Sequence, residues 1–321
     1  MLPRPAIRLL PPAAPLLLLA ACAAPLPAQL PGAGAEGTVP VQVPVAVRFA
    51  ARVGAQPFRC GAGYDGIGRT ASRITPSDFR FYVSSVALLD EDGRAVPLRL
   101  EQDGRWQYRD VALLDFEDGS GPCRNGNAGL REAVTGHVPA GRYRGLQFTL
   151  GVPADLNHGD PAVAPPPLNL SAMFWSWQAG YKFVKIDMAT RGQARGGTAP
   201  PADAAPVPAA APRRRAAGFP IHLGSTDCVS PAATAAPSSC ARPNRVTVRL
   251  DAFDVATEQV EFDLAALLRD TDVDVNAPDS APGCMAGPDD ADCRFVMPAF
   301  GLPFDGQPAL PQRVFRAAPR G

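Results

Sequence analysis

Apolar and polar residues alternate in many short stretches of this chain, and this two-residue period restricts its fold most. The stretches 41–49, 78–90, 141–152 and 244–253 place valine, leucine or phenylalanine at nearly every second position. Such a period is typical of a β-strand with one buried face. Long helical periods are missing, and only 256–270 mixes a strand with one or two helical turns. The chain is therefore predicted to be all-β.

Glycine, proline and aspartate separate these stretches. The residues EDG at 91–93 end one predicted strand, and 95–117 is predicted to form a hairpin around the DG pair at 103–104. Many short strands joined by such turns favour a β-sandwich. All-β proteins of this length often form a single unit. We therefore expect one β-sandwich-like domain over 41–316 with long disulfide-pinned loops, followed by a tail at 317–321.

The first residues have the features of an export signal. Residues 1–21 carry Arg4 and Arg8 ahead of the apolar run PLLLLAAC, which is too short to span a bilayer. The run closes as LAAC, which resembles a bacterial lipoprotein cleavage site, so Cys22 is predicted to become a lipidated first residue. A signal peptide with a chance cysteine is the alternative. Both predict an exported protein, and the proline-rich stretch 22–40 suits a flexible tether.

Export changes the interpretation of the cysteines, because an even number in an oxidising compartment favours disulfides. With Cys22 set aside, six of the seven remain: Cys60, Cys123, Cys228, Cys240, Cys284 and Cys293. Pairs at 228–240 and 284–293 would each close a short loop, which leaves Cys60–Cys123 as a long-range bridge. Other pairings stay open on sequence alone. No C-x-x-C spacing is present, which argues against a zinc ribbon or a thioredoxin-type site.

Charge and composition argue against several functions. The chain has 31 basic and 31 acidic residues, with no basic stripe for nucleic acid and no later apolar run that could cross a membrane. The stretch 191–218 is a Pro/Ala/Gly/Arg insertion without periodicity, predicted to be a loop, and its arginines at 213–215 are interpreted as solvated linker charges. The acidic stretch 270–293 has carboxylates that could bind calcium, but it lacks the order of an EF-hand loop.

Catalytic motifs are absent from the sequence. It contains no G-x-S-x-G elbow, no H-E-x-x-H, no phosphate-binding glycine loop and no C-x-x-C-H haem attachment, so a stand-alone enzyme is not expected. Of the three histidines, His158 and His222 have unusual settings, DLNHGD and IHLGSTDC, whereas His137 is interpreted as a surface turn residue. The scattered methionines are interpreted as residues that fill gaps in the core.

The stretch 170–187, LSAMFWSWQAGYKFVKID, holds two of the three tryptophans. If it forms a single strand, Trp175 and Trp177 share one face with Met173. Three large apolar groups on one face usually pack in a core, and this interpretation stands beside a functional one. Tyr181, Lys182 and Lys185 do not fit the alternation, so some of them are expected to be exposed where a partner docks, with ordinary strand-edge residues as the alternative.

Several stretches together resemble the MbnP family, whose members are also called metallo-mystery pair four-Cys motif proteins. They are FRCGAGYDGIG, DFRFYVSSVALL, VALLDFEDGSGPC, GVPADLNHGDP, PLNLSAMFWSWQAGYKFVKID, HLGSTDC and GCMAGPDDADCRFVMPAFGL. The resemblance covers 41–316 and implies a periplasmic copper-binding protein encoded beside a di-haem, cytochrome c peroxidase-like enzyme of the MbnH type. An outer-membrane transporter is a further expected partner. The family is named for four cysteines, whereas the exported part of this chain has six, so one pair is additional.

In that pairing the di-haem enzyme oxidises a tryptophan of its partner to kynurenine, and the modified protein binds copper. An intact indole offers only an N–H donor, whereas kynurenine has an aryl amine nitrogen that can donate to copper. Imidazole is also a good copper ligand. The resemblance therefore points to His158 and His222 as ligands, with Trp175 or Trp177 as the kynurenine. The sequence does not choose between the two tryptophans.

Three further residues are expected to support this site. Asp155 and Asp160 would orient His158 through its second ring nitrogen, and Tyr181 would relay electrons between the haem and the tryptophan. The alternative is a carbohydrate- or small-ligand-binding β-sandwich that uses the tryptophan pair as a stacking platform, which would not need the two histidines. A purely structural surface lipoprotein is the third interpretation.

Overall fold

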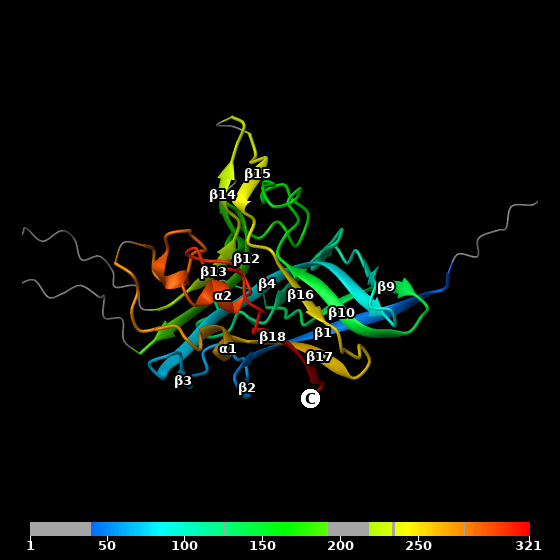
Figure 1. Ribbon diagram of the computed structural model, residues 1–321, viewed down its shortest axis with the longest axis horizontal. Coiled ribbons are helices and arrows are strands. Elements are labelled where there is room, and N and C mark those ends of the chain that lie inside the picture. The colour runs from blue at the N-terminus through cyan, green and yellow to red at the C-terminus, as the bar shows by residue number, and fades with distance from the viewer. Residues whose placement is uncertain are drawn as a thin grey trace, which may run out of the picture. The chain divides into compact units, whose positions relative to one another are not determined.

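The computed structural model describes residues 40–124, 126, 128–176, 178–191, 218–232, 235–278 and 280–321. Residues 40–321 form one compact unit of two β-sheets and a separate hairpin (Figure 1). The predicted signal peptide, nearly all of the tether, and Cys22 lie outside the described residues. So do Trp177 and residues 192–217 of the predicted insertion, with its run of arginines.

The larger sheet is organised around one long strand. This strand, β4, pairs antiparallel with five others and therefore connects most of the sheet. The strands are β4 (Ser72–Asp90), β3 (Tyr64–Ile67), β5 (Ala95–Pro97), β8 (Val111–Asp115), β10 (Tyr143–Leu150) and β12 (Gly180–Thr190). Further strands extend it: β16 (Val246–Leu250) on β10, β7 (Gln107–Tyr108) on β8, and β11 (Phe174–Ser176) and β13 (Ile221–Gly224) on β12.

The smaller sheet has the order β18-β17-β1-β9-β6, with β2 also on β1. Its strands are β18 (Phe315–Pro319), β17 (Glu258–Asp263), β1 (Gln42–Val53), β9 (Ala133–Pro139), β6 (Arg99–Leu100) and β2 (Gln56–Pro57). Only β1 and β17 run parallel among the pairs described in this sheet. A separate hairpin is formed by β14 (Thr226–Val229) and β15 (Ser239–Arg242).

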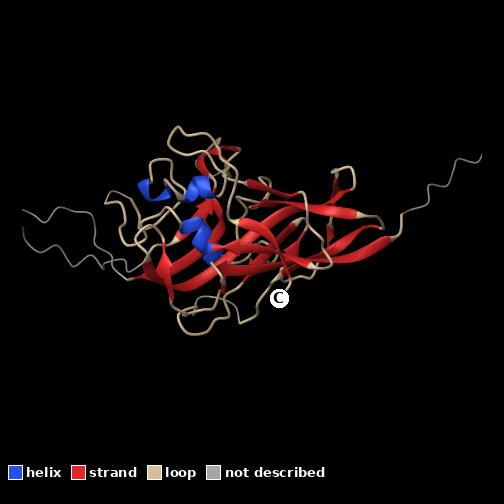
Figure 2. Ribbon diagram, turned by 60° about the horizontal axis from the view of Figure 1, so that its bottom comes forward, coloured by secondary structure: helices blue, strands red, loops and turns tan. Residues whose placement is uncertain are grey.

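Helical segments are few and short, and they gather near one end of the strands (Figure 2). They are α1 (Leu264–Leu268), α2 (Val296–Ala299) and the 3-10 turns η1 (Ser171–Met173) and η2 (Ala291–Cys293). The Asp263 side chain caps α1 by accepting the Ala265 N–H, and this agrees with the predicted strand followed by helical turns at 256–270. Among the described residues, no helix has the length and apolarity needed to cross a membrane.

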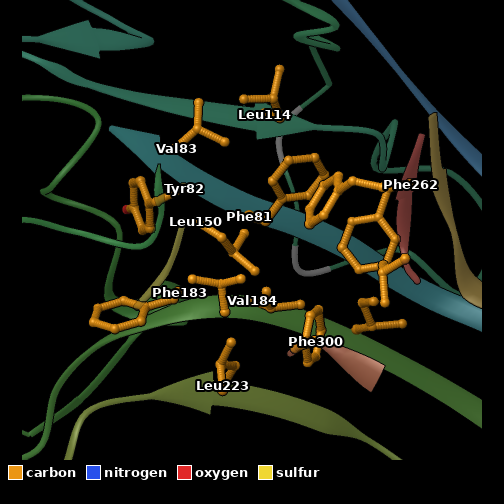
Figure 3. Close-up of a cluster of buried hydrophobic side chains, with 14 of the residues drawn as sticks. Phe81, Tyr82, Val83, Leu114, Leu150, Phe183, Val184, Leu223, Phe262 and Phe300 are labelled. Carbon is orange, nitrogen blue, oxygen red and sulfur yellow. The ribbon is translucent and has the colours of Figure 1, made fainter. Parts of the chain in front are cut away.

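Phenylalanine rings from both sheets meet and form the core (Figure 3). Phe49 of β1 lies 5.4 Å from Phe148 of β10 and 6.1 Å from Phe81 of β4 between ring centroids. Phe262 of β17 lies 5.2 Å from Phe81. Such aromatic pairs contribute about 0.5–1.5 kcal/mol each beyond the burial of their area. The prediction of an all-β, sandwich-like domain is confirmed.

Three disulfides pin the loops, in the pairs that the spacing favours. Cys60–Cys123 spans 63 residues, whereas Cys228–Cys240 and Cys284–Cys293 span 12 and 9. Cys228 and Cys240 face each other across the β14–β15 hairpin. The long-range bridge restricts the unfolded chain most, because closing a longer loop costs more entropy.

Two local predictions are wrong. Residues 95–117 are not one hairpin, because β5 pairs with β4 while β6 pairs with β9 of the other sheet, and only β7 and β8 form a hairpin. The DG turn at 103–104 exists, held by Asp103, whose carboxylate accepts three backbone N–H groups that follow it. Residues 317–319 are not a tail, since β18 extends to Pro319 and pairs with β17.

Candidate metal centre

The tryptophan stretch is a hairpin and not the single strand that the sequence suggested. β11 and β12 are antiparallel neighbours, and Gly180 adopts a φ of 81°, a region that favours glycine. Met173 belongs to η1 and is fully buried, whereas Trp175 on β11 is only partly buried and packs against the core. The two residues therefore do not share a strand face.

The indole of Trp175 lies against the backbone of β13 at Gly224. A Cβ atom on Gly224 would come within 2.4 Å of Cζ3 and 3.0 Å of Cη2 of the indole, so the six-membered ring fills the space of a side chain there. His222 and Gly224 are two residues apart on β13 and face the same side of the strand. Trp175 therefore covers the side of β13 on which His222 lies.

His222 is held by a carboxylate from the neighbouring strand. Its Nε2 lies 2.8 Å from Oδ1 of Asp187 on β12, and its backbone N–H donates to the carbonyl of Cys284. The side chain is 14% exposed. No hydrogen bond to Nδ1 is found among the described residues. A neutral imidazole that donates Nε2–H to Asp187 keeps a lone pair on Nδ1 for a metal.

Asp187 stands at one end of a chain of buried charges across β12 and β4. Lys185 Nζ lies 2.5 Å from Asp187 Oδ2 and also binds Asp78. Asp78 in turn binds Arg80 through both carboxylate oxygens, at 2.9 and 2.5 Å. The side chains of Arg80 and Asp78 are 1% and 3% exposed. Because the charges alternate in sign, each buried ion has an opposite charge beside it, as burial of ions requires.

The charges around Asp187 keep it ionised. Burial raises the pKa of this carboxyl, but the hydrogen bond with His222 and the charge of Lys185 outweigh burial and hold the pKa well below its usual range. The pKa of Lys182, on the same strand, is also lowered, by burial and by the charge of Lys185, and for an ammonium group this favours the neutral form. The Lys182 ammonium donates to the carbonyl of Ala172 at 3.0 Å. Asp187 is therefore a carboxylate at neutral pH.

His158 lies beside the β14–β15 hairpin. Its Nε2 is 3.5 Å from Cys240 Sγ, in the disulfide, and 3.2 Å from Nδ2 of Asn157. Asn157 also reaches Ser225, the residue that follows β13, at 3.3 Å. His158 is thus tied to the end of β13 through Asn157, whereas His222 belongs to the strand itself.

The two aspartates expected beside His158 bind other groups. Asp155 pairs with Arg109 at 3.0 Å, and Asp160 accepts the backbone N–H of Ala162 at 2.9 Å. The carboxylate found on a predicted ligand is Asp187, on His222, which the sequence reasoning missed. Its signal was an aspartate that stands with two lysines in the otherwise largely apolar stretch 180–190.

Tyr181 is not an exposed docking residue, and neither is Lys185, which corrects that interpretation. Tyr181 is fully buried and its hydroxyl donates to the carbonyl of Leu168 at 2.5 Å. Burial raises its pKa to about 12. Its ring lies 4.9 Å from Phe174 and 5.9 Å from Tyr82, so Tyr181 connects the tryptophan hairpin with the interior of the larger sheet.

Met285 is a thioether close in the fold to β13. Cys284 forms an isolated parallel bridge with Ile221, so Met285 and His222 each directly follow one of the two bridged residues. Met285 and Asp187 also line one cavity of about 570 Å³. A thioether suits Cu(I). The sequence did not predict that Met285 lies near β13, because the bridge joins segments that are distant in the chain.

The carboxylates of the acidic stretch 270–293 bind protein groups, which include Arg313 on Asp270, two hydroxyl groups on Asp274 and backbone N–H groups of the stretch itself. Asp290 accepts the Met285 N–H at 2.8 Å, and Asp292 accepts the Ala277 N–H at 2.9 Å. Burial raises the pKa of Asp290 and raises that of Asp292 to about 6. Carboxylates so arranged give the calcium prediction no further support.

Comparisons with known proteins agree on one family. The family model named MbnP matches residues 42–286, a range that contains every residue of the site around His222 and His158. A solved structure, MbnP from Methylosinus trichosporium, is similar with a TM-score of 0.72 and 32% identity, covering 88% of this chain and 100% of that chain. No curated protein sequence matches the chain.

Proposed function

Because this chain belongs to the MbnP family, which acts in methanobactin and copper systems, we propose that it is a copper-binding protein completed by oxidation of a tryptophan. A di-haem cytochrome c peroxidase-like enzyme of the MbnH type converts Trp175 or Trp177 to kynurenine. The kynurenine amine then binds copper together with imidazole nitrogens of His222 and His158. The protein is the substrate of that enzyme and is not itself an enzyme.

The observation that carries this proposal is the contact between Trp175 and β13. Oxidation opens the five-membered ring of an indole and leaves the amine on the six-membered ring. In Trp175 that six-membered ring lies against Gly224, two residues from His222. The ring atoms nearest Gly224, Cζ3 and Cη2, lie across the ring from Cε2, the carbon that keeps the amine, so the contact holds the ring against β13 and leaves the amine on its opposite side. We propose Trp175 as the modified residue because its ring packs against the strand that carries His222.

Three residues on or near β13 carry soft or borderline donor atoms. His222 offers Nδ1, Met285 offers a thioether, and His158 approaches the end of the same strand. A set of imidazole, aryl amine and thioether suits Cu(I) better than a hard cation such as Ca²⁺. We therefore propose Cu(I) as the bound state, with Met285 added to the predicted ligands.

The disulfides indicate the cellular compartment of the protein. Three disulfides within the described residues indicate an oxidising, extracytoplasmic compartment. We place the protein in the periplasm, anchored through a lipid on Cys22, where the di-haem enzyme and an outer-membrane transporter would meet it.

Peptide mass spectrometry across 171–182 tests the modification. Protein from its native periplasm is compared with protein expressed without a di-haem partner. We expect one tryptophan of the native sample to gain an oxygen and lose a carbon, and that tryptophan to be Trp175. Two intact tryptophans in a native sample that still binds copper would refute the kynurenine site.

Alanine variants test the ligands. His222→Ala, His158→Ala and Met285→Ala are each compared with His137→Ala, a control on β9 of the other sheet. Copper affinity is measured by anaerobic competition with a Cu(I) chelator, on protein whose kynurenine content is known. We expect the three site variants to lose affinity and the control to keep it. Unchanged affinity in all of them, together with binding of oligosaccharides, would favour the stacking platform.

A further inference from the structure

We propose that Asp187 is a positioning residue that fixes the tautomer of His222, with Nε2–H directed to the carboxylate and Nδ1 directed to the metal. The assignment of the tautomer depends only on the contact between Asp187 and His222 in the apo protein. Only the assignment of Nδ1 as the copper donor rests on the proposed function.

The two oxygens of Asp187 have separate roles. Oδ1 lies 2.8 Å from His222 Nε2, and Oδ2 lies 2.5 Å from Lys185 Nζ. A carboxylate only accepts hydrogen bonds, so the Asp187 contact requires a proton on Nε2. In a neutral ring the lone pair then resides on Nδ1, the nitrogen for which the described residues provide no hydrogen bond.

The strands fix Asp187 in this orientation. Lys185 pairs with His222 of β13 on one side and with Arg80 of β4 on the other, and Asp187 pairs with Asp78. These pairings set the charged side chains in a row across three strands. Lys185 is shared between Asp78 and Asp187, so rotating Asp187 toward the cavity would break an ion pair in a buried site.

Burial of this row of charges costs desolvation free energy, so stability alone does not explain it. Burying several ions is often no more stabilising than an apolar replacement of similar volume. Metal-binding histidines, by contrast, are commonly oriented by a carboxylate on the second ring nitrogen, and loss of that carboxylate typically costs 10–100-fold in metal affinity. The row fits this second role, because it ends on the imidazole of His222.

The substitution Asp187→Asn gives a sharp test, because the Lys185 ammonium only donates hydrogen bonds and therefore favours the oxygen of the amide over its NH₂ group. The amide should turn its oxygen to the Lys185 ammonium and its NH₂ group to His222. Nε2 would then accept a hydrogen bond, and the proton of the ring would move to Nδ1. Asp187→Glu, which keeps the charge, should restore the Nε2–H tautomer.

Nitrogen-15 NMR of apo protein labelled at histidine measures the tautomer directly, and His222→Ala assigns the signal. We expect Nε2–H in the wild type and in Asp187→Glu, and Nδ1–H in Asp187→Asn. Nδ1–H in the wild type, or an unchanged tautomer in Asp187→Asn, would overturn the proposal. Asp65→Asn serves as the matched control, because Asp65 is exposed and pairs with Arg73.

Copper affinity supplies a second measurement. On protein with equal kynurenine content, we expect Asp187→Asn to bind Cu(I) about 10–100-fold more weakly than the wild type, and Asp65→Asn to bind it equally. Equal affinity of Asp187→Asn and wild type would refute Nδ1 as the donor. If the wild type binds no copper but shows the expected tautomers, the proposed function fails and the role of Asp187 in fixing His222 stands.

Discussion

The buried ion pair between Arg80 and Asp78 makes a strong prediction about stability. The two side chains are 1% and 3% exposed and are joined by two hydrogen bonds of 2.9 and 2.5 Å. Arg80 also lies 3.9 Å from Glu117, another buried carboxylate. Arg80→Met preserves an unbranched apolar stem and removes the charge. In this variant Lys185 is the cation that remains beside Asp78, and Glu117 loses the positive charge of Arg80.

The magnitude follows from the burial of these groups. Removing one partner of a buried pair costs about 3–5 kcal/mol, because the remaining ion stays desolvated without its counter-charge. A domain is typically stable by only about 5–15 kcal/mol, so Arg80→Met should remove a large part of the free energy of unfolding. Lys185 still neutralises part of the charge of Asp78, which places the expected loss at the lower end, about 3 kcal/mol.

Guanidinium unfolding of apo protein with its disulfides intact measures this loss, by linear extrapolation to zero denaturant. Arg94→Met is the matched control. Arg94 pairs with Asp92, also two residues away, but these side chains are 74% and 66% exposed. An exposed pair contributes about 0–1 kcal/mol. A loss below about 1 kcal/mol in Arg80→Met, equal to that of the control, would refute the view that the buried charges depend on one another.

Three further predictions concern other parts of the fold. Gly224→Ala places a methyl group within 2.4 Å of the indole of Trp175, so we expect a loss of about 1–3 kcal/mol and a lower kynurenine yield by mass spectrometry; an unchanged yield would show that the contact is dispensable. Burial raises the pKa of Asp292 to about 6, above its unfolded value near 4, so its contribution to stability is lost as the pH rises through this interval. Asp292→Asn should therefore stabilise the protein by roughly 1–2 kcal/mol at pH 7 and hardly at pH 4, measured by denaturation at both values; equal effects at the two pH values would contradict the assignment. Replacing Cys60 and Cys123 together by alanine opens a bridge spanning 63 residues and should cost about 4 kcal/mol, and a midpoint of unfolding equal to the wild type would argue against the restriction of the unfolded chain.

The sequence alone determined the class of fold and the family, and it supplied candidates for the site. The two-residue period identified β1, β10 and β16, because alternation along one strand is a local property that does not depend on the partner strand. The resemblance to the MbnP family is confirmed by the family model and by the solved structure. His158, His222 and Trp175 stay predicted ligands, chosen through the resemblance to the family.

Only the tertiary structure decided which strands became neighbours, and the wrong predictions for 95–117 and 317–319 depend on that. The stretch 95–117 divides between two sheets, and residues 317–319 form a strand only because β17 lies beside them. The contact of Asp187 with His222 joins residues 35 positions apart, and the bridge that brings Met285 near β13 joins segments more distant still. Periodicity reports which face of a strand is buried, whereas the partner across a sheet is chosen by packing and loop closure over the whole chain. For that reason the sequence supplied the copper-ligand candidates, and the fold supplied the carboxylate that orients one of them.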